Sequence, residues 1–308
     1  MGPMTRTAVG IAAAGAAGLA YAAVVEPRLF TVRRFAIPVL PSGSGPIRVL
    51  HISDVHMLPN QEAKQRWLRG LAGLEPDLVV STGDNLSHAD AVPSVLRAYG
   101  DLLDLPGVFV FGSNDYYSPR RPSWIDYLRG GSGVDVRGPW GRQPDLPFAD
   151  MRAAFTQRGW ADLTNRHATL EVAGRTLAFV GVDDPHLKLD VLDDVPADAS
   201  ADLAVGVAHA PYLRVLDRWN ALGYPLILAG HTHGGQLRLP FYGAIVTNCD
   251  LDTGRARGLH QHATPGHDPS WMHVSAGLGA SPFAPVRFCC RPEASLLTLT
   301  ALDSPGSP

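Results

Sequence analysis

The sequence predicts an α/β fold, because short apolar runs recur along the chain and each one ends at a polar residue. Runs of about five to eight aliphatic or β-branched residues, bounded by glycine or polar turns, are typical of buried strands. Helical stretches at residues 61–74 and 91–103 separate some of these runs. Since α/β proteins place their sites at the carboxyl ends of adjacent strands, we expect the polar residues after the strands to converge.

The predicted strands form an ordered series. A short strand at residues 31–39 and a Pro/Ser/Gly-rich linker at 41–46 come first. The later strands, each with the polar residues that follow it, are Ile47–Ile52 with Asp54 and His56, Asp77–Ser81 with Asp84, Gly107–Phe111 with Asn114, Arg175–Val182 with Asp183 and Asp184, Leu203–Ala208 with His209, and Pro225–Ala229 with His231 and His233. Residues 116–166, rich in proline and glycine and with a helical stretch at 148–158, are interpreted as an insertion that covers the site.

The N-terminal residues 8–25 carry no charge and are apolar or small throughout. As a helix they would extend about 27 Å, the short end of a bilayer-spanning segment. We favour an uncleaved, single-pass signal anchor over two alternatives, a cleaved signal peptide with Ala20-Tyr21-Ala22 as its cleavage site, which would export the protein, and a buried helix. Three arginines follow the segment, at 28, 33 and 34. They favour a cytoplasmic position for the rest of the chain, whereas a signal peptide would place it outside, so the side of the membrane stays open.

Bulk composition excludes several classes of protein. A hydrophobic fraction of 45% with 18% charged residues is that of a globular protein and not of a disordered chain. The net charge of −3 provides no basic surface for nucleic acid, which is therefore not expected as a partner. Three cysteines, at 249, 289 and 290, make neither a disulfide framework nor a C-x-x-C zinc motif. No pattern assigns an oligomeric state.

The residues at the strand ends have the chemistry of metal ligands. Carboxylate, imidazole and amide groups suit Mn, Fe or Zn, and two such ions side by side activate a water for hydrolysis. Asp84 suits a shared position because a carboxylate offers two oxygens. Asp54 and His56 are two residues apart, as are His231 and His233, so each pair is expected to face the site from one extended stretch. The predicted ligands of two divalent ions are Asp54, His56, Asp84, Asn114, His209, His231 and His233.

The strings around these residues resemble those of the calcineurin-like metallophosphoesterases. The D-x-H, G-D, G-N-H, H and G-H-x-H blocks of that family occur here in the same order, as Ser53-Asp54-Val55-His56, Gly83-Asp84-Asn85, Gly112-Ser113-Asn114-Asp115, Ala208-His209-Ala210 and Gly230-His231-Thr232-His233-Gly234-Gly235-Gln236. The resemblance covers roughly residues 47–300. With the strand-end pattern it implies a four-layer α/β/β/α sandwich of two mixed sheets, preceded by the N-terminal apolar helix, with a dinuclear metal centre at the sheet edge.

The resemblance also implies how the ligands divide. One metal would be held by Asp54, His56, Asp84 and His233, and the other by Asp84, Asn114, His209 and His231. The chain then divides into an anchor or signal segment at 1–30, an edge strand and linker at 31–46, a metallophosphoesterase domain at 47–303 and a disordered tail at 304–308. The Gly-His-Thr-His-Gly-Gly-Gln string, the N-terminal segment and residues 282–287 resemble the membrane-associated bacterial branch.

The third block departs from the family pattern, which is Gly-Asn-His followed by Asp or Glu. Aligned without a gap, Ser113 replaces the liganding asparagine and Asn114 replaces the histidine. A shift of one residue keeps Asn114 as the ligand, and we prefer it because an amide carbonyl binds cations better than a neutral hydroxyl. Either alignment leaves this loop without a histidine beside the scissile bond. Asp115 then either takes over a proton-transfer role or forms a structural salt bridge with an arginine.

The function implied is a dinuclear-metal phosphohydrolase or phosphodiesterase. A metal-bridging hydroxide would attack phosphorus in line, with His231, Asn114 and Asp115 as the catalytic side chains. Some members of the membrane-associated branch act on lipid-linked nucleotides, so a lipid- or envelope-linked phosphate ester is the expected substrate, and a weak general acid favours an acidic leaving group. The alternatives are a phosphatase or nucleotide phosphodiesterase of soluble substrates, and a non-catalytic scaffold with this fold.

Other polar residues have weaker assignments. Arg120 and Arg121 are expected either to bind a phosphate oxygen or to lie in a solvated turn. Asp183 and Asp184 are candidate hydrogen-bond partners of a liganding histidine. The remaining histidines of interest are expected on the surface or in loops, at positions His186, His260, His262, His267 and His273.

Overall fold

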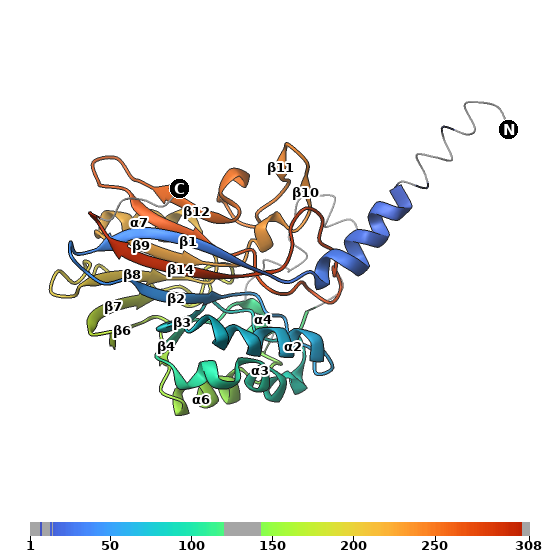
Figure 1. The fold of residues 1–308 in the computed structure, drawn as a ribbon, viewed down its shortest axis with the longest axis horizontal. Helices are drawn as coiled ribbons and strands as arrows, with labels where there is room; N and C mark the ends of the chain where they lie inside the picture. The colour runs from blue at the N-terminus through green and yellow to red at the C-terminus, as the bar shows by residue number, and fades with distance from the viewer. Residues whose placement is uncertain (1–6, 8–12, 14, 120–142, 304–308) are drawn as a thin grey trace.

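Two six-stranded mixed sheets organise the computed structural model, which describes residues 7, 13, 15–119 and 143–303 (Figure 1). The first sheet has the order β1-β14-β2-β3-β4-β5 and the second β12-β13-β9-β8-β7-β6. In the first sheet only the β14–β2 pair is antiparallel, and in the second only β12–β13 and β6–β7 are. The prediction of an α/β protein with two mixed sheets is confirmed.

The predicted strands lie close to where the structure has them. Strand β2 has the predicted bounds, whereas β4 ends two residues early because the chain leaves the ladder before Gly112. The first sheet consists of β1 (Thr31–Leu40), β2 (Ile47–Ile52), β3 (Leu78–Ser81), β4 (Gly107–Phe109), β5 (Ala161–Asp162) and β14 (Glu293–Ala301). The second consists of β6 (Arg166–Val172), β7 (Arg175–Gly181), β8 (Leu203–Val207), β9 (Leu226–Ala229), β12 (Gly258–His262) and β13 (Ser270–Val274).

Helices cover the outer faces of the two sheets. The outer face of the first sheet carries α2 (Glu62–Arg69), α3 (Val92–Tyr99) and α6 (Phe148–Gln157), and that of the second carries α7 (Leu213–Ala221). The remaining elements are η1 (Tyr21–Val25), η2 (Glu26–Arg28), η3 (Gly70–Leu74), η4 (Ala89–Ala91), η5 (Gly100–Asp104), α4 (Ser113–Tyr116), η6 (His233–Gly235), β10 (Arg238–Leu239), β11 (Gly243–Ala244) and η7 (Thr253–Arg255).

Three apolar cores separate these layers. Successive residues of a strand point to opposite faces, so Val49 of β2 packs between the sheets while Leu50 packs under the helices. The same alternation sends Ile227 of β9 toward α7 and Leu228 into the space between the sheets. The order is therefore helices, sheet, sheet, helix. Helix α6, within the expected insertion, contributes Phe155 to the core under the first helix layer.

The N-terminal helix projects from the body of the molecule in Figure 1. Residues 15–20 are helical and continue into η1 and η2. Within the part of the chain that the structure describes, no helix is long and apolar enough to cross a membrane. The anchor expected at residues 8–25 falls partly outside the described residues and stays a prediction, as do the roles of Arg120 and Arg121 and the disordered tail at 304–308.

Two histidines are buried between the sheets. His51 of β2 and His273 of β13 lie with their Nδ1 atoms 2.9 Å apart, and His51 Nε2 lies 3.0 Å from Thr82 Oγ1. The expectation of a surface or loop position is thus wrong for His273 and for His262, which is buried at the end of β12, whereas His186 lies in a loop, as expected, but is buried. Burial lowers the pKa of His51 to about 3 and that of His273 well below its usual range, so both imidazoles are neutral in the folded protein.

This pair predicts a loss of stability in mild acid. The folded-state pKa of His51 is depressed, so its contribution is fully present above the unfolded-state pKa of about 6.5 and is lost as pH falls toward 3. At pH 5 the loss is about 2 kcal/mol, because the unfolded chain takes up a proton that the folded chain does not. The free energy of unfolding is measured in urea at pH 7.5 and at pH 5. Between these two pH values it should fall by about 2 kcal/mol less for His51→Gln than for wild type. The exposed control His267→Gln should behave as wild type, and equal drops in all three proteins would contradict the prediction.

Candidate metal centre

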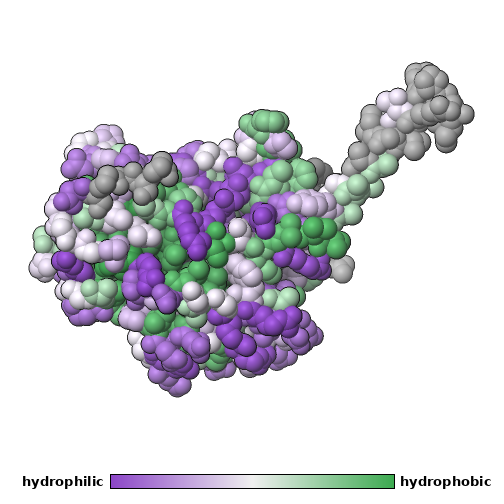
Figure 2. All heavy atoms as spheres, viewed as in Figure 1, coloured by the Kyte–Doolittle hydropathy of each residue, from purple (hydrophilic) through white to green (hydrophobic). Residues whose placement is uncertain are grey.

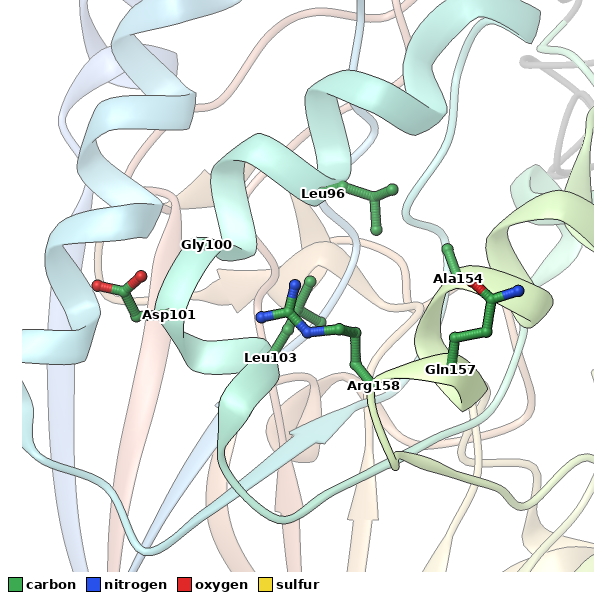
Figure 3. Close-up of a pocket in the computed structure, with 7 residues that line it drawn as sticks. All are labelled: Leu96, Gly100, Asp101, Leu103, Ala154, Gln157 and Arg158. Carbon is green, nitrogen blue, oxygen red and sulfur yellow. The ribbon is translucent and has the colours of Figure 1, made fainter.

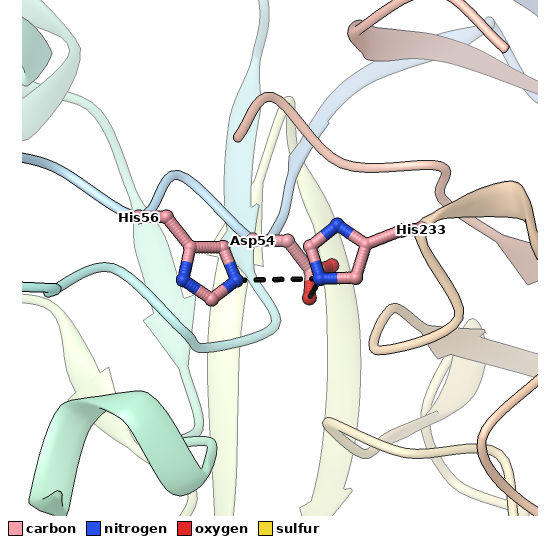
Figure 4. A group of neighbouring side chains, drawn as sticks. All are labelled: Asp54, His56 and His233. Atoms are coloured by element: carbon pink, nitrogen blue, oxygen red, sulfur yellow. Dashed lines mark hydrogen bonds and ion pairs between the residues drawn. The ribbon is translucent and has the colours of Figure 1, made fainter. Parts of the chain in front are cut away.

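Five predicted ligands converge where the carboxyl ends of strands from the two sheets meet. Asp54, His56 and Asp84 follow strands of the first sheet, and His209 and His233 follow strands of the second. Two groups have all their ligand atoms within 4.8 Å of one another, namely Asp54 with His56 and His233, and Asp54 with Asp84 and His209. Figure 4 shows the side chains of the first group pointing toward one another. All five side chains are buried.

Asp84 lies between histidines from both sheets. Its Oδ2 is 3.4 Å from His56 Nε2, and its Oδ1 is 3.6 Å from His209 Nε2. On the other side, His56 Nε2 is 3.3 Å from His233 Nε2, which is 3.6 Å from Asp54 Oδ1. The two carboxylate oxygens of Asp84 thus face different histidines, one from each sheet.

The lone pairs at this centre fit a divalent cation. His209 Nδ1 is 2.7 Å from Thr82 O and His233 Nδ1 is 3.1 Å from Gly279 O. A carbonyl oxygen only accepts, so each Nδ1 carries a hydrogen, and each Nε2 faces the centre, where a cation would take the place of any proton on it. Within the described ranges, His209 Nε2 and Asp54 Oδ1 are buried without a hydrogen-bond partner. Buried polar atoms left unpaired are costly, and a cation would satisfy both.

Burial lowers the pKa values of these imidazoles, whereas the neighbouring carboxylates raise them. Burial lowers the pKa of His56 to about 3 and also lowers the pKa of His231 and His233, which leaves them neutral, the form that binds metals. Burial disfavours the charged form of His209 too, but the charges of Asp84 and Asp184 outweigh it and raise the pKa of His209 to about 9. The carboxylates therefore attract positive charge to the centre.

Backbone strain is concentrated at the same residues. The φ angles of Asp54, His56 and Asp84 are 49°, 44° and 55°, and those of His231 and His233 are 69° and 49°. The extended stretches expected for the Asp-x-His and His-x-His pairs are therefore wrong, because these residues lie in the left-handed region. Such conformations cost about 1–3 kcal/mol each in non-glycine residues and occur mainly at functional sites. Their presence at five of the seven predicted ligands indicates that the loops are shaped by the site.

The third block brings Asn114 against Asp84. The backbone N of Asn114 donates to Asp84 Oδ1 and its Nδ2 to Asp84 Oδ2, both at 2.7 Å, while Ser113 Oγ lies 3.3 Å from that Nδ2. The carboxylate of Asp115 accepts from the backbone N of Asp84 and Asn85 at 2.8 Å and of Gly112 at 3.0 Å. Across the described segments no arginine pairs with Asp115. Its contacts hold the two ligand loops together, and its catalytic role stays a prediction.

The remaining predicted ligand, His231, lies beside His209, with ring centroids 5.2 Å apart. Its Nε2 is 3.2 Å from Asn248 O, which leaves Nδ1 as the atom without a proton. On its other side is His186, with ring centroids 4.7 Å apart. His186 Nδ1 lies 3.0 Å from Tyr212 Oη, and Asp184 Oδ1 accepts from the backbone N of His186 at 2.8 Å. His186 is thus at the edge of the centre and was missed, because its position in a loop carries no periodic signal.

Arg287 is a second residue that the sequence did not single out. It is fully buried, and its Nη2 donates to Ala276 O at 2.8 Å, to Gly277 O at 3.1 Å and to Gly279 O. It therefore fixes the loop whose Gly279 carbonyl orients His233.

A separate hollow of about 400 Å³ between α3, η5 and α6 (Figure 3) has none of the predicted ligands in its lining.

Comparisons with known proteins agree with this geometry. A profile of the calcineurin-like phosphoesterase family matches residues 47–235, more than half of the 308-residue chain. The chain is 26% identical to the Bacillus subtilis protein named "Uncharacterized metallophosphoesterase YkuE", over 96% of this chain and 95% of the relative. It is 23% identical to the Escherichia coli phosphodiesterase YaeI, with 93% and 94% covered. It is 25% identical to the Chlamydia trachomatis UDP-2,3-diacylglucosamine pyrophosphatase LpxG, with 89% and 90% covered.

The profile match includes the left-handed ligand loops and all seven predicted ligand positions, from Asp54 to His233. Two of the three relatives are named for the hydrolysis of a phosphodiester or a diphosphate. The family predicted from the sequence blocks is confirmed. The chain belongs to the calcineurin-like phosphoesterase family and is a metal-dependent hydrolase of phosphoric esters.

Proposed function

We propose that this enzyme is a dinuclear-metal phosphohydrolase or phosphodiesterase with Asp84 as the shared ligand. The observation that carries the proposal is the position of Asp84, whose two oxygens face His56 and His209 at 3.4 and 3.6 Å. One cation would be held by Asp54, His56, Asp84 and His233, and the other by Asp84, Asn114, His209 and His231. Mn, Fe or Zn would suit this mixture of carboxylate, imidazole and amide.

The cations would supply Lewis-acid activation of a water and neutralise charge on the phosphoryl oxygens during in-line attack on phosphorus. The protein side chains prepare this chemistry. Thr82 and Gly279 orient His209 and His233 through their carbonyls, and Asp115 ties the Asp84 loop to the loop of Asn114. At the outer side of the centre, the imidazole of His186 lies beside His231 and can hydrogen-bond a phosphoryl oxygen through its Nε2.

The substrate proposed is a diphosphate, or a phosphodiester with an acidic leaving group, because the third block lacks the histidine that would protonate a poor leaving group. The leaving group of a diphosphate is a weakly basic phosphate, and that of such a phosphodiester is a weakly basic alkoxide or phenoxide, so both depend less on protonation than simple alkyl esters do. The names of YaeI and LpxG support both classes, and LpxG supports a lipid-linked substrate. Some relatives are named as transmembrane proteins, which supports a membrane location for the full chain. Its N-terminal segment would provide the anchor.

The test measures bound metal by elemental analysis together with hydrolysis of bis-p-nitrophenyl phosphate by the full chain. Wild type should hold about two divalent ions per chain, because seven carboxylate, imidazole and amide ligands suffice for two cations. Asn114→Ala should lose most of its activity and one metal, while the neighbouring Ser113→Ala should keep both, because only Asn114 reaches Asp84.

Each other outcome has a definite meaning. An indifferent Asn114→Ala with a crippled Ser113→Ala would contradict the ligand assignment and restore the gapless alignment. Turnover with one metal would contradict the dinuclear centre. Neither metal nor turnover in the folded chain would contradict the proposal as a whole and favour the scaffold alternative.

A further inference from the structure

The β10–β11 hairpin exposes five large apolar side chains directly after the loop that holds His233. We call them the hairpin patch, which consists of Leu239, Phe241, Tyr242, Ile245 and Val246. Phe241 is fully exposed, Tyr242 is 75% exposed and the other three are about half exposed. Single exposed apolar side chains are ordinary, whereas a group of this kind marks an interaction site. Figure 2 shows hydrophobic residues gathered over the hairpin.

A second apolar surface lies at the base of the N-terminal helix. This helix patch consists of Leu19, Tyr21, Val24 and Val25, all exposed. The segment 287–290 joins it to the hairpin. On the hairpin side, Phe288 N donates to Gln236 O at 3.1 Å and Arg238 N donates to Phe288 O at 2.9 Å. On the helix side, the Phe288 ring contacts Tyr21 and Arg287 N donates to Ala22 O at 2.9 Å. Both patches are therefore built on one short piece of chain and belong to one surface.

The charged residues within the three segments that form this surface are almost all basic, with the exposed acids Asp250 and Asp252 beyond the end of the second segment. The three segments that form it, residues 15–34, 236–247 and 281–292, contain one acid, Glu26, and that acid is buried under the backbone N of Cys289 and Cys290. Their basic residues are Arg28, Arg33, Arg34, Arg238, Arg287 and Arg291. Three of these, Arg28, Arg34 and Arg291, are exposed. Apolar side chains with a basic rim complement an anionic lipid surface.

The same chain segments also support the metal centre. Cys290 Sγ lies 3.2 Å from His233 O, and Gly235 packs so closely on Ala244 of β11 that a Cβ at Gly235 would lie 2.3 Å from the Ala244 Cβ. The hairpin is thus held rigidly against the loop of His233. A membrane in contact with the hairpin would lie beside the edge at which the ligands converge.

We propose that the hairpin patch and the helix patch dock together onto an anionic lipid bilayer, with Phe241 and Tyr242 inserted at its interface. The hairpin is then a second membrane contact, separate from any N-terminal span, and it sets the metal centre at the lipid surface. This docking does not depend on the proposed chemistry, because neither patch contains a proposed ligand.

The test measures quenching of tryptophan fluorescence by brominated lipid. Full-length Phe241→Trp and the control Val191→Trp, at a 64%-exposed position in the second sheet's β7–β8 connection, are mixed with phosphatidylcholine–phosphatidylglycerol vesicles that contain bromo-phosphatidylcholine. The signal of the six native tryptophans is subtracted with wild type. We expect strong quenching at position 241 and none at 191, even if the N-terminal segment alone holds every variant on the vesicles.

A pair of double variants provides the second readout. Phe241→Ser with Tyr242→Ser should weaken vesicle binding at least tenfold. Where the N-terminal segment alone keeps the chain on the vesicles, the same double change should instead reduce the quenching of a tryptophan placed at position 238 by Arg238→Trp. Val191→Ser with Val195→Ser should change neither, and hydrolysis of soluble bis-p-nitrophenyl phosphate should be unchanged in both. Equal quenching at 241 and 191 would overturn the proposal. A wild-type dimer that Phe241→Ser dissociates, without lipid quenching, would also overturn it and assign the surface to a second copy of the chain.

Discussion

Asp84→Asn is expected to lower kcat for bis-p-nitrophenyl phosphate by at least about 10³ and to reduce the bound metal from two ions per chain to one or fewer. Metal ions supply several kcal/mol of transition-state stabilisation, and each 1.36 kcal/mol is a factor of ten in rate. The asparagine keeps one oxygen and loses the charge. It therefore cannot offer one oxygen to a cation beside His56 and another to a cation beside His209, as the carboxylate would.

The fold should survive this change, which separates a lost site from a lost structure. Burial and, to a smaller extent, the charge of Asp84 raise the pKa of the fully buried Asp115 to about 7, so removing that charge relieves a repulsion in the metal-free protein. It also removes the attraction that raises the pKa of His209 to about 9. Because these two effects oppose each other, metal-free Asp84→Asn should still unfold cooperatively and at a temperature close to that of metal-free wild type. The control Asp90→Asn, an exposed acid in η4, should keep both metals and full activity. An Asp84→Asn protein with two tightly bound ions would refute the shared ligand.

The sequence was sufficient for elements whose pattern is local. Strand β2 is a short, mainly apolar run, and its bounds could be predicted to the residue because Pro46 precedes it and the polar Ser53 and Asp54 follow it. The ligand positions followed from the same logic, since parallel strands of one sheet must end at the same edge. His209 alone carried almost no signal, and it became a candidate only through its position after the run that forms β8.

Features that depend on tertiary contacts could not be predicted from local sequence patterns. His273 and His186 are isolated polar residues in the sequence, and their burial results from the meeting of two sheets and from the packing of a loop beside His231. Helix α7 is short, and its charged residues conceal the apolar side chains that face the second sheet. The left-handed backbone of the ligand loops is also invisible to a pattern of alternating side chains, which predicts extended chain there.

Gly230→Ala is expected to destabilise the fold by about 2–3 kcal/mol and to weaken metal binding and kcat together, at least about tenfold. A Cβ at this position would lie 1.8 Å from Ser53 Oγ and 2.7 Å from Asp54 Oδ2. Gly230 directly follows β9 of the second sheet and Ser53 directly follows β2 of the first, so the added methyl group would push the two sheets apart at the metal-facing edge. Asp54 would move with Ser53, because Ser53 Oγ bonds to its carboxylate at 2.5 Å.

Two comparisons make this result specific to the close contact. Gly70→Ala, at a helix end where a Cβ meets nothing within 4 Å and φ is −63°, should leave activity unchanged and stability equal or higher by up to about 1 kcal/mol. Ser53→Ala removes the nearest atom, so the double variant Ser53→Ala with Gly230→Ala should recover part of the lost stability in chemical unfolding. Strict additivity of the two changes would contradict the mechanism, because residues in direct contact should show a coupling energy. The approach of the two sheets at Gly230 is then what sets the distance between Asp54 and the histidines of the second sheet.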